Sequence, residues 1–291
     1  MRIDLHTHTT QSDGTSSPAE LVHAALAVPL RALGITDHDT FAGYEEAAPL
    51  ARDAGLELIC GIELSTQLNL EGRKGRRPSA HLLGYFLDAE PTPDFREWLA
   101  LQRENRDRRN IALIAKLRSL GVEITLEEVK QVGRNQTGRP HFAHVLVRKG
   151  HAVNQRQAFD LFLADDAPSS VEREQVPVEE GLSRLREAGA IPVVAHPIRL
   201  PFRSGDQRLL ELLDKLKQQG LEGLECHHSE HSPEDVLAFQ AIARRLDLKE
   251  TGGSDFHGGN KPDIDLGTGR NGNVDVPYRL LEALRETHAA A

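Results

Sequence analysis

Six of the chain's fourteen histidines stand in short motifs with carboxylates, and most of these motifs follow an apolar run. Imidazole and carboxylate groups are the side chains that bind Zn²⁺, Mn²⁺, Fe and Mg²⁺. Nine such candidates are too many for one four-coordinate ion, so the pattern indicates two or three metals and metal-assisted hydrolysis. The candidate ligands are His6, His8, Asp13, His38, Glu63, His81, His196, Asp255 and His257.

Two pairs of candidates are two residues apart. Because side chains alternate between the faces of a strand, His6 and His8 should point the same way on the first strand. The same reasoning places Asp255 and His257 on one face of the final strand. One such pair is a weak signal, since paired histidines often lie at a surface. Two pairs, with further candidates at the ends of other apolar runs, favour a common site.

Aspartates flank His38 in the run Thr36-Asp37-His38-Asp39. We expect His38 to bind metal and Asp37 to orient it, because a metal-binding histidine usually donates its second ring N–H to a neighbouring acceptor. Three further histidines follow an apolar run and should lie near the rim of the site, where one of them could contact substrate or transfer a proton. These are His227, His228 and His231.

Apolar strand-like runs alternate with helical patterns, which is typical of an α/β protein with a largely parallel sheet. Ligands from the first and last strands must meet at one centre, and this favours a closed, distorted TIM-like barrel of about seven strands. The expected strands cover residues 3–5, 33–36, 56–64, 81–87, 191–195, 221–226 and 249–254. The expected outer helices cover 19–27, 43–54, 178–188, 206–219, 233–245 and 277–287.

The segment between Thr66 and Ser79 has no helical periodicity. A parallel crossover needs about a dozen residues and usually a helix, so we expect strand 81–87 to return antiparallel and to bring His81 towards Glu63. A basic run at residues 73–77 forms the tip of this hairpin. It either attracts a nucleotide or RNA or is simply a solvated loop.

Residues 92–175 break the alternation and predict an inserted helical cap, which leaves residues 1–91 and 176–291 as the barrel. Its expected helices cover 95–120, 126–132, 141–149 and 154–163. Residues 101–156 hold twelve Lys and Arg against five Asp and Glu, although the whole chain has a net charge of −9. A basic segment beside metals favours an anionic substrate such as phosphate, while surface helices also often carry solvated charge.

The remaining composition narrows the class of protein. No stretch of 18 or more apolar residues exists, which argues against a membrane segment, and the amino terminus has no signal-peptide pattern. Cys60 and Cys226 lie in apolar runs, so we expect buried free thiols in a reducing cytoplasm rather than a disulfide framework. Nothing in the sequence indicates an obligate protein partner.

The motifs, in this order, resemble those of the polymerase and histidinol phosphatase (PHP) family over residues 3–257, interrupted at the insert. The resemblance implies a distorted (β/α)₇ barrel that hydrolyses phosphoesters with two or three metals, most often Mn²⁺, Fe or Zn²⁺, and we expect Mn²⁺. It implies one ion bound by His6, His8, Glu63 and Asp255, a second by Glu63, His81 and His196, and a third by Asp13, His38 and His257. The motifs are His6-Thr7-His8, Ser12-Asp13-Gly14, Thr36-Asp37-His38, Gly61-Ile62-Glu63, Ala195-His196-Pro197 and Ser254-Asp255-Phe256-His257.

The insert resembles, more narrowly, PHP enzymes that dephosphorylate 3′,5′-nucleotide bisphosphates and trim short RNA from its 5′ end. The marks are Arg134-Asn135, residues 137–143 and the run His196–Arg199. The resemblance implies that a metal-activated hydroxide, rather than a protein nucleophile, removes the 3′-phosphate. Arg134 and Asn135 would bind the 5′-phosphate and Arg199 would hold phosphate through its guanidinium. Arg139 would either bind phosphate or form a structural ion pair within the cap.

Other functions remain open at this point. A histidinol-phosphate phosphatase would explain the metals but not a cap of this length with its arginines. A non-catalytic PHP module that binds metal or nucleotide has no chemical need for nine ligands. A zinc-dependent amidohydrolase is disfavoured because the basic cap suits a phosphate substrate.

Overall fold

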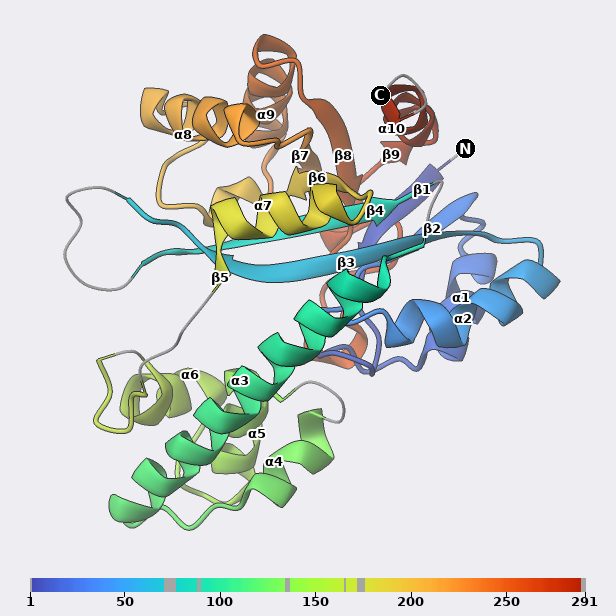
Figure 1. Cartoon of the computed structure of the whole chain (residues 1–291). Helices are drawn as coiled ribbons and strands as arrows, with labels where there is room; N and C mark the ends of the chain where they lie inside the picture. The colour runs from blue at the N-terminus through green and yellow to red at the C-terminus, as the bar shows by residue number, and fades with distance from the viewer. Residues whose placement is uncertain are drawn as a thin grey trace. The chain divides into compact units, whose positions relative to one another are not determined.

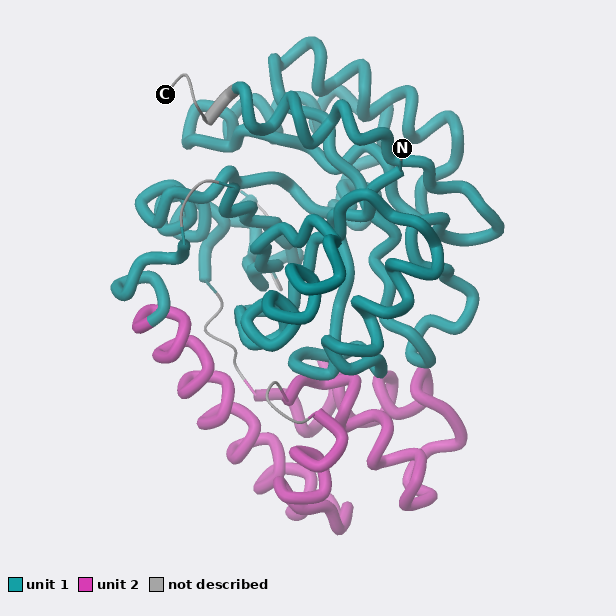
Figure 2. Tube along the Cα trace, turned by 90° about the vertical axis from the view of Figure 1, so that its right-hand side faces the viewer, with its two compact units in different colours: residues 1–96, 175–291 teal, residues 97–174 magenta. Residues whose placement is uncertain are grey.

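The computed structural model describes residues 2–70, 77–87, 90–133, 137–164, 166–171 and 176–288 (Figure 1). The chain divides into two compact units, residues 1–96 with 175–291 and residues 97–174 (Figure 2). The boundaries expected from the sequence, 91/92 and 175/176, lie close to these. The helix α3 (Pro93–Ser119) carries the chain from the first unit into the second.

Within the described residues, the first unit is built on a sheet of nine strands. They are β1 (Arg2–Thr7), β2 (Ala32–Ile35), β3 (Glu57–Gln67), β4 (Ser79–Phe86), β5 (Val176–Pro177), β6 (Ile191–Val194), β7 (Gly223–His228), β8 (Lys249–Gly253) and β9 (Val276–Pro277). Their hydrogen-bonded order is β8-β7-β6-β4-β3-β2-β1-β9, with β5 paired to β3. The sheet curves into a nearly closed barrel, which confirms the predicted α/β barrel class. The short strands β5 and β9 were not expected.

A seam between β1 and the segment after β8 closes the barrel. The His8 N–H donates to the Phe256 carbonyl (2.9 Å), and the Asp255 N–H donates to the His6 carbonyl (2.8 Å). Gly253 lies against this seam, where an added Cβ would come within 2.3 Å of the His6 backbone nitrogen. The absence of a side chain at Gly253 therefore lets the two ends of the sheet approach each other.

The strands β3 and β4 form the predicted antiparallel hairpin. Ser65 lies opposite His81, so His81 returns to the level of Glu63 as expected. The strand β4 is also antiparallel to β6, whereas β1, β2 and β3 are mutually parallel, as are β6, β7 and β8. The strand β4 thus runs against its two neighbours between two parallel groups, and the short β9 pairs antiparallel with β1 at the end of the order.

The helices of the first unit lie outside this sheet (Figure 1). They are α1 (Pro18–Ala27), α2 (Ala42–Asp53), α7 (Val178–Glu187), α8 (Gln207–Gln218), α9 (Pro233–Arg245) and α10 (Arg279–His288), close to the expected ranges. A capping box starts α1: Ser17 Oγ accepts the Glu20 N–H, and the Glu20 carboxylate accepts the Ser17 N–H. With Pro18 at its first position, these contacts satisfy backbone donors that the helix leaves free, and they fix where it begins.

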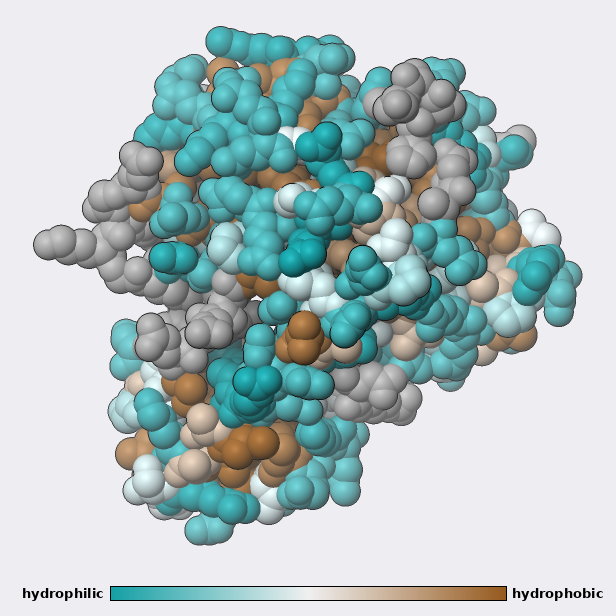
Figure 3. All heavy atoms as spheres, in the orientation of Figure 1, coloured by the Kyte–Doolittle hydropathy of each residue, from teal (hydrophilic) through white to brown (hydrophobic). Residues whose placement is uncertain are grey.

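The second unit is helical and has a hydrophobic core of its own. It contains most of α3, α4 (Leu126–Gly133), α5 (Arg139–Arg148), α6 (Gln155–Ala158) and the π-helix η1 (Phe159–Leu163). Leu117, Phe142 and Leu146 are among the buried side chains of this core. Brown hydrophobic side chains gather over this unit in Figure 3. None of the described helices combines the length and apolar composition needed to cross a bilayer.

Candidate metal centre

The candidate ligands converge where β1, β2, β6 and β8 end and where β4 begins. Eight of the nine fall into three groups whose ligand atoms lie within 4.8 Å of one another. The groups are His8, Asp13, His38 and His257; His6, His8, Glu63 and Asp255; and His38, Glu63 and His81. The ninth, His196, joins them because its Nε2 lies 2.8 Å from Glu63 Oε1.

Glu63 lies among imidazoles on both sides. Its Oε1 lies 2.7 Å from His81 Nδ1 as well as beside His196. Its Oε2 lies close to three further nitrogens, His6 Nε2 at 3.2 Å, His8 Nε2 at 3.1 Å and His38 Nδ1 at 3.3 Å. Each oxygen therefore faces its own set of nitrogens, which is the geometry expected of a carboxylate that bridges two ions.

Asp13 provides a second carboxylate at the edge of the cluster. Its Oδ1 lies 3.2 Å from His257 Nε2, and its Oδ2 lies 3.7 Å from His38 Nε2. Because His38 presents Nδ1 to Glu63 and Nε2 to Asp13, its ring connects the two carboxylates. Asp13 is the more exposed of the two, with 23% of its side chain accessible against 1% for Glu63.

Hydrogen bonds behind the cluster fix the orientation of two rings. His6 Nδ1 donates to Glu225 Oε1 at 2.8 Å, which leaves its Nε2 lone pair facing Glu63. His257 Nδ1 donates to the Asp255 carbonyl at 2.8 Å, which leaves its Nε2 facing Asp13. Partners of this kind set the tautomer that a metal-binding histidine needs.

Three carboxylates at the cluster favour the ionised form. Burial raises the pKa of Asp13, Glu63 and Asp255, but neighbouring imidazoles, and Lys261 beside Asp255, hold all three pKa values well below the usual range. Burial lowers the pKa of His38 to about 4, so this ring is neutral at pH 7. Buried negative charge is costly without positive partners. Positive charge beside the carboxylates, from protonated imidazoles or from bound cations, therefore stabilises the site.

The residues fit divalent metal ions. Two buried nitrogens of the cluster, His8 Nε2 and His38 Nδ1, have no hydrogen-bond partner within the described residues. Ligand atoms about 2.1 Å from one ion lie roughly 3.0–3.4 Å apart. The separations of Glu63 Oε2 and Asp255 Oδ1 from His6 and His8 run from 3.1 to 3.5 Å. Unpartnered nitrogens at this spacing are what a metal-binding cage presents.

One expectation about the ligands needs correction. Asp255 and His257 were expected to share one face of the last strand, but β8 ends at Gly253. Asp255 instead adopts a left-handed backbone with φ of 57°, and this turn brings its side chain to the cluster. The set of Glu63, His81 and His196 that the family resemblance implied stays a prediction; His38 also lies near Glu63 and His81. His196 lies beside the same Glu63 oxygen as His81.

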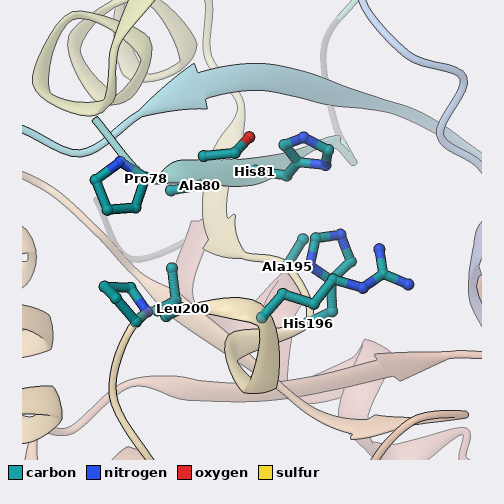
Figure 4. Close-up of a pocket in the computed structure, with 9 residues that line it drawn as sticks. Pro78, Ala80, His81, Ala195, His196 and Leu200 are labelled. Atoms are coloured by element: carbon teal, nitrogen blue, oxygen red, sulfur yellow. The ribbon is translucent and has the colours of Figure 1, made fainter. Parts of the chain in front are cut away.

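Arg199 and a cavity adjoin the cluster. Arg199 lies in the short 3₁₀ helix η2 (Pro197–Arg199), makes two hydrogen bonds to Glu230 (2.7 and 2.8 Å) and contacts Asp255 Oδ2 at 3.0 Å. A cavity of ≈ 380 Å³ is lined by Arg199, His81 and His196 among others. Figure 4 shows the His81 ring on β4 facing the His196 ring across this cavity. The cavity thus leads directly to candidate ligands.

Asp37 contacts the loop that carries His8. Its carboxylate accepts hydrogen bonds from the Thr9 N–H (2.7 Å), the Thr9 hydroxyl (2.7 Å) and the Ser12 hydroxyl (2.6 Å). Ser12 Oγ in turn lies 3.4 Å from His8 Nδ1. We expected Asp37 to orient His38, but these contacts support the loop of His8 instead.

The fold brings to the centre two residues that sequence reasoning did not single out, Glu225 and Lys261, and one that it placed near the rim, His228. Glu225 binds His6, Lys261 Nζ lies 2.6 Å from Asp255 Oδ2, and His228 Nε2 lies 3.2 Å from the same oxygen. Glu225 interrupts an apolar strand run, and this was the available signal. His228 lies near the site as predicted for the histidines that follow this strand.

The predicted substrate contacts of the insert are only partly described. Arg139 Nη1 donates to the Leu163 carbonyl at 3.1 Å, a contact inside the second unit. Arg134 and Asn135 lie outside the described residues, as does most of the basic run at 73–77. Their predicted roles therefore stay predictions.

The chain matches the PHP domain family over residues 4–149. It is 32% identical over 256 residues to a 5′-3′ exoribonuclease from Haemophilus influenzae, covering 88% of this chain and 90% of that protein. It is 30% identical over 268 residues to a 3′,5′-nucleoside bisphosphate phosphatase from Chromobacterium violaceum, covering 91% and 90%. A solved structure from Bifidobacterium adolescentis, described as a metal-dependent phosphoesterase, aligns with a TM-score of 0.77 at 32% identity over 97% of this chain and 95% of that one.

Proposed function

This chain belongs to the PHP domain family, and from that premise we propose that it is a metal-dependent phosphoesterase. Its preferred substrate would be a 3′,5′-nucleotide bisphosphate, which would lose its 3′-phosphate to leave a 5′-mononucleotide. The observation that carries the proposal is the convergence of nine imidazoles and carboxylates, Glu63 among them, beside a cavity lined by Arg199. The Chromobacterium violaceum relative, similar over nine tenths of both chains, is named for this activity.

Two or three divalent ions would be held by the three groups of ligands. Mixed nitrogen and oxygen donors suit Mn²⁺, Fe or Zn²⁺, and we propose Mn²⁺. Bound there, such ions supply an activated water at neutral pH and neutralise charge on the phosphoryl oxygens. Glu63 would hold two of them together, since its two oxygens face different nitrogens.

The chain's own residues would bind and orient the substrate. The Arg199 guanidinium remains charged at any physiological pH, because Glu230 and Asp255 raise its pKa against the effect of burial. From the cavity wall it can donate to a phosphoryl oxygen in a fixed direction. We propose that Arg134 and Asn135 bind the 5′-phosphate, as the sequence predicts, while Arg139 is held by the Leu163 carbonyl.

A second activity is supported by the relatives named as exoribonucleases. Release of a 5′-mononucleotide from the 5′ end of a short RNA breaks the same bond between phosphorus and the 3′ oxygen. The leaving group is the same, but the phosphorus also carries the rest of the RNA as a second ester. The Haemophilus influenzae exoribonuclease is 32% identical to this chain over 88% of its length. We therefore propose short 5′-phosphorylated RNA as an additional substrate.

The cysteines support a reducing compartment. Cys60 and Cys226 are free and buried. We infer a cytoplasmic location from this thiol chemistry and from the nature of the proposed substrate.

The test is steady-state turnover of the Mn²⁺-loaded full chain on four substrates. We expect adenosine 3′,5′-bisphosphate to give the highest kcat/KM, short 5′-phosphorylated RNA to be cleaved, and 5′-AMP to be a poor substrate. Histidinol phosphate as the best substrate would show that the subgroup is wrong. Full Mn²⁺ loading without turnover of any of the four would favour a non-catalytic binding module.

A further inference from the structure

One buried carboxylate outside the ligand set holds two of the candidate ligands. Glu225 lies within β7 and is fully buried. Its Oε1 accepts the hydrogen bond from His6 Nδ1 at 2.8 Å, and its Oε2 accepts the backbone N–H of His196 at 2.6 Å. The two oxygens thus reach two ligands that lie 190 positions apart in the numbering of the chain.

The contact with His6 determines which ring nitrogen is free. A carboxylate accepts and cannot donate, so His6 must carry its proton on Nδ1. The lone pair of Nε2 then faces Glu63 Oε2 (3.2 Å) and Asp255 Oδ1 (3.5 Å). The other oxygen of Glu225 is occupied by the His196 N–H, so each carboxylate oxygen accepts one hydrogen bond from a candidate ligand.

The contact with His196 supports an unusual backbone. His196 has φ of 28° and ψ of 65°, in the left-handed region that residues with a side chain rarely adopt. Such a conformation persists only where the surroundings hold it. The bond from the His196 N–H to Glu225 is one constraint, and the turn of η2 is another, since the Arg199 N–H donates to the His196 carbonyl at 3.0 Å. Together they aim the imidazole at Glu63 Oε1.

The strand β7 is irregular next to Glu225. The register of β7 against β8 shifts between Glu225 and His227, so the pairing is irregular just after Glu225. Irregular pairing of this kind often redirects side chains next to functional sites. It interrupts β7 at the level of the candidate centre.

We propose that Glu225 is a positioning residue that presents His6 and His196 together to neighbouring ions, so that it sets metal affinity and links the occupancy of two sites. This inference rests on the metal centre of the proposed function, but not on its substrate. Partners behind a metal-binding histidine typically change metal affinity about 10- to 100-fold when they are replaced.

The isosteric variant Glu225→Gln separates positioning from packing. An amide keeps the size of the side chain but offers one acceptor oxygen and one NH₂ donor. If the oxygen stays with the His196 N–H, the NH₂ group faces His6 Nδ1 and forces the proton of His6 onto Nε2, where it blocks metal binding. In the opposite orientation, the NH₂ group faces the His196 N–H and disrupts the turn.

Mn²⁺ titration of the chelator-treated full chain by calorimetry is the test, with Glu57→Gln as the matched control. Glu57 is a partly buried carboxylate that accepts the Tyr278 hydroxyl at 2.8 Å and contacts no candidate ligand. We expect Glu225→Gln to weaken Mn²⁺ binding about 10- to 100-fold, at the sites of His6 and His196 together. The control Glu57→Gln should bind Mn²⁺ as the unaltered chain does. Wild-type affinity and stoichiometry in Glu225→Gln would overturn the proposal.

A second measurement does not depend on a folded variant. In the Zn²⁺-loaded unaltered chain, ¹⁵N spectra of the histidine rings should show His6 protonated at Nδ1 and metal-bound at Nε2. The reverse assignment would overturn the proposal. Loss of turnover with intact metal binding contradicts only the proposed function, whereas a chain that binds no Mn²⁺ or Zn²⁺ contradicts both.

Discussion

The guanidinium of Arg199 lies 3.0 Å from Oδ2 of Asp255, and the other oxygen of that carboxylate lies 3.4 Å from His8 Nε2. One carboxylate thus contacts the candidate ligands with one oxygen and an arginine of the cavity wall with the other. Lys261 contacts the same Oδ2 atom at 2.6 Å. The position of Arg199 is therefore tied to the centre, and substitutions there should affect substrate binding more than folding.

Replacement of Arg199 by lysine should weaken substrate binding. An ammonium cannot maintain the paired hydrogen bonds to Glu230 and the contact with Asp255 at once. Since a charged hydrogen bond contributes about 1.5–3 kcal/mol, we expect KM for the bisphosphate to rise roughly tenfold or more while Mn²⁺ content stays constant. Kinetics with elemental analysis would check this. Arg208→Lys, at an exposed pair with Asp206, is the control, and an unchanged KM in Arg199→Lys would contradict the prediction.

Glu63→Gln should lower the metal content of the chain, and not only its affinity for substrate. An amide cannot serve as an anionic bridge between the nitrogens on the two sides of Glu63. We expect the loss of at least one Mn²⁺ per chain. The fall in kcat/KM should exceed the ~10–100-fold effect of replacing a residue that only hydrogen-bonds to a metal ligand. Elemental analysis after dialysis measures the first effect. Full metal content with low turnover would assign Glu63 a role other than metal binding.

Removal of metal should lower thermal stability. Without cations, the buried carboxylates of Glu63 and Asp255 lose favourable partners inside the barrel. An ion present at 100 times its Kd stabilises the folded state by about 2.7 kcal/mol, which corresponds to a Tm shift of about 4 °C for a chain of 291 residues. Thermal melts with Mn²⁺ and with chelator would measure this shift. Glu63→Gln should show a smaller shift, and equal shifts would contradict the prediction.

His231 should make stability depend on pH in mild acid. Burial and the neighbouring His228 lower the pKa of His231 from 6.5 to about 4, although its Nδ1 donates to the Cys226 carbonyl at 2.8 Å. Between these values the unfolded chain binds a proton that the folded chain excludes, so stability is fully present above pH 6.5 and is lost as pH falls towards 4. From pH 7 to pH 5 this group should contribute a loss of about 2 kcal/mol.

Urea unfolding of the chelator-treated chain at the two pH values would measure this loss. His231→Phe preserves ring packing against Phe239, where the ring centroids lie 4.7 Å apart, and cannot bind a proton. The variant should therefore lose about 2 kcal/mol less between pH 7 and pH 5 than the unaltered chain does. The same pH dependence in both proteins would assign the acid sensitivity to other groups.

Arg134→Ala should weaken the binding of one substrate without abolishing phosphoester hydrolysis. If Arg134 binds the 5′-phosphate, its loss should raise KM for adenosine 3′,5′-bisphosphate roughly tenfold or more. Turnover of p-nitrophenyl phosphate, which has no second phosphate, should be unchanged. Equal effects on both substrates would contradict this role. Arg148→Ala on α5 serves as the control for lost positive charge in the same unit.

The sequence predicted the strands and helices, and most of the side chains that lie together at the candidate centre, because two physical patterns were explicit in it. Apolar runs ending in His or a carboxylate predicted strands that deliver ligands to one rim, and the missing helix between Thr66 and Ser79 predicted the hairpin that brings His81 to Glu63. Local chemistry at Ser17 and Pro18 predicted the start of α1. Each of these features depends on neighbours within a few residues.

The features that were missed depend on contacts between distant segments. Asp255 reaches the centre through a left-handed turn, and no local pattern requires that conformation in Ser254-Asp255-Phe256. Asp37 lies beside His38 in sequence, yet it binds Thr9 and Ser12 from another loop. The two-residue strands β5 and β9 are too short to have a periodicity of their own.

The seam between β1 and the end of β8 gives the candidate centre an order of assembly. Its first ligand along the chain, His6, leaves the ribosome more than two hundred residues before its last, His257. The nascent chain consequently offers only isolated fragments of the cage until translation passes residue 257 and Gly253 docks against His6. Stable capture of an ion should therefore be a late event, one that follows the joining of the two ends of the sheet.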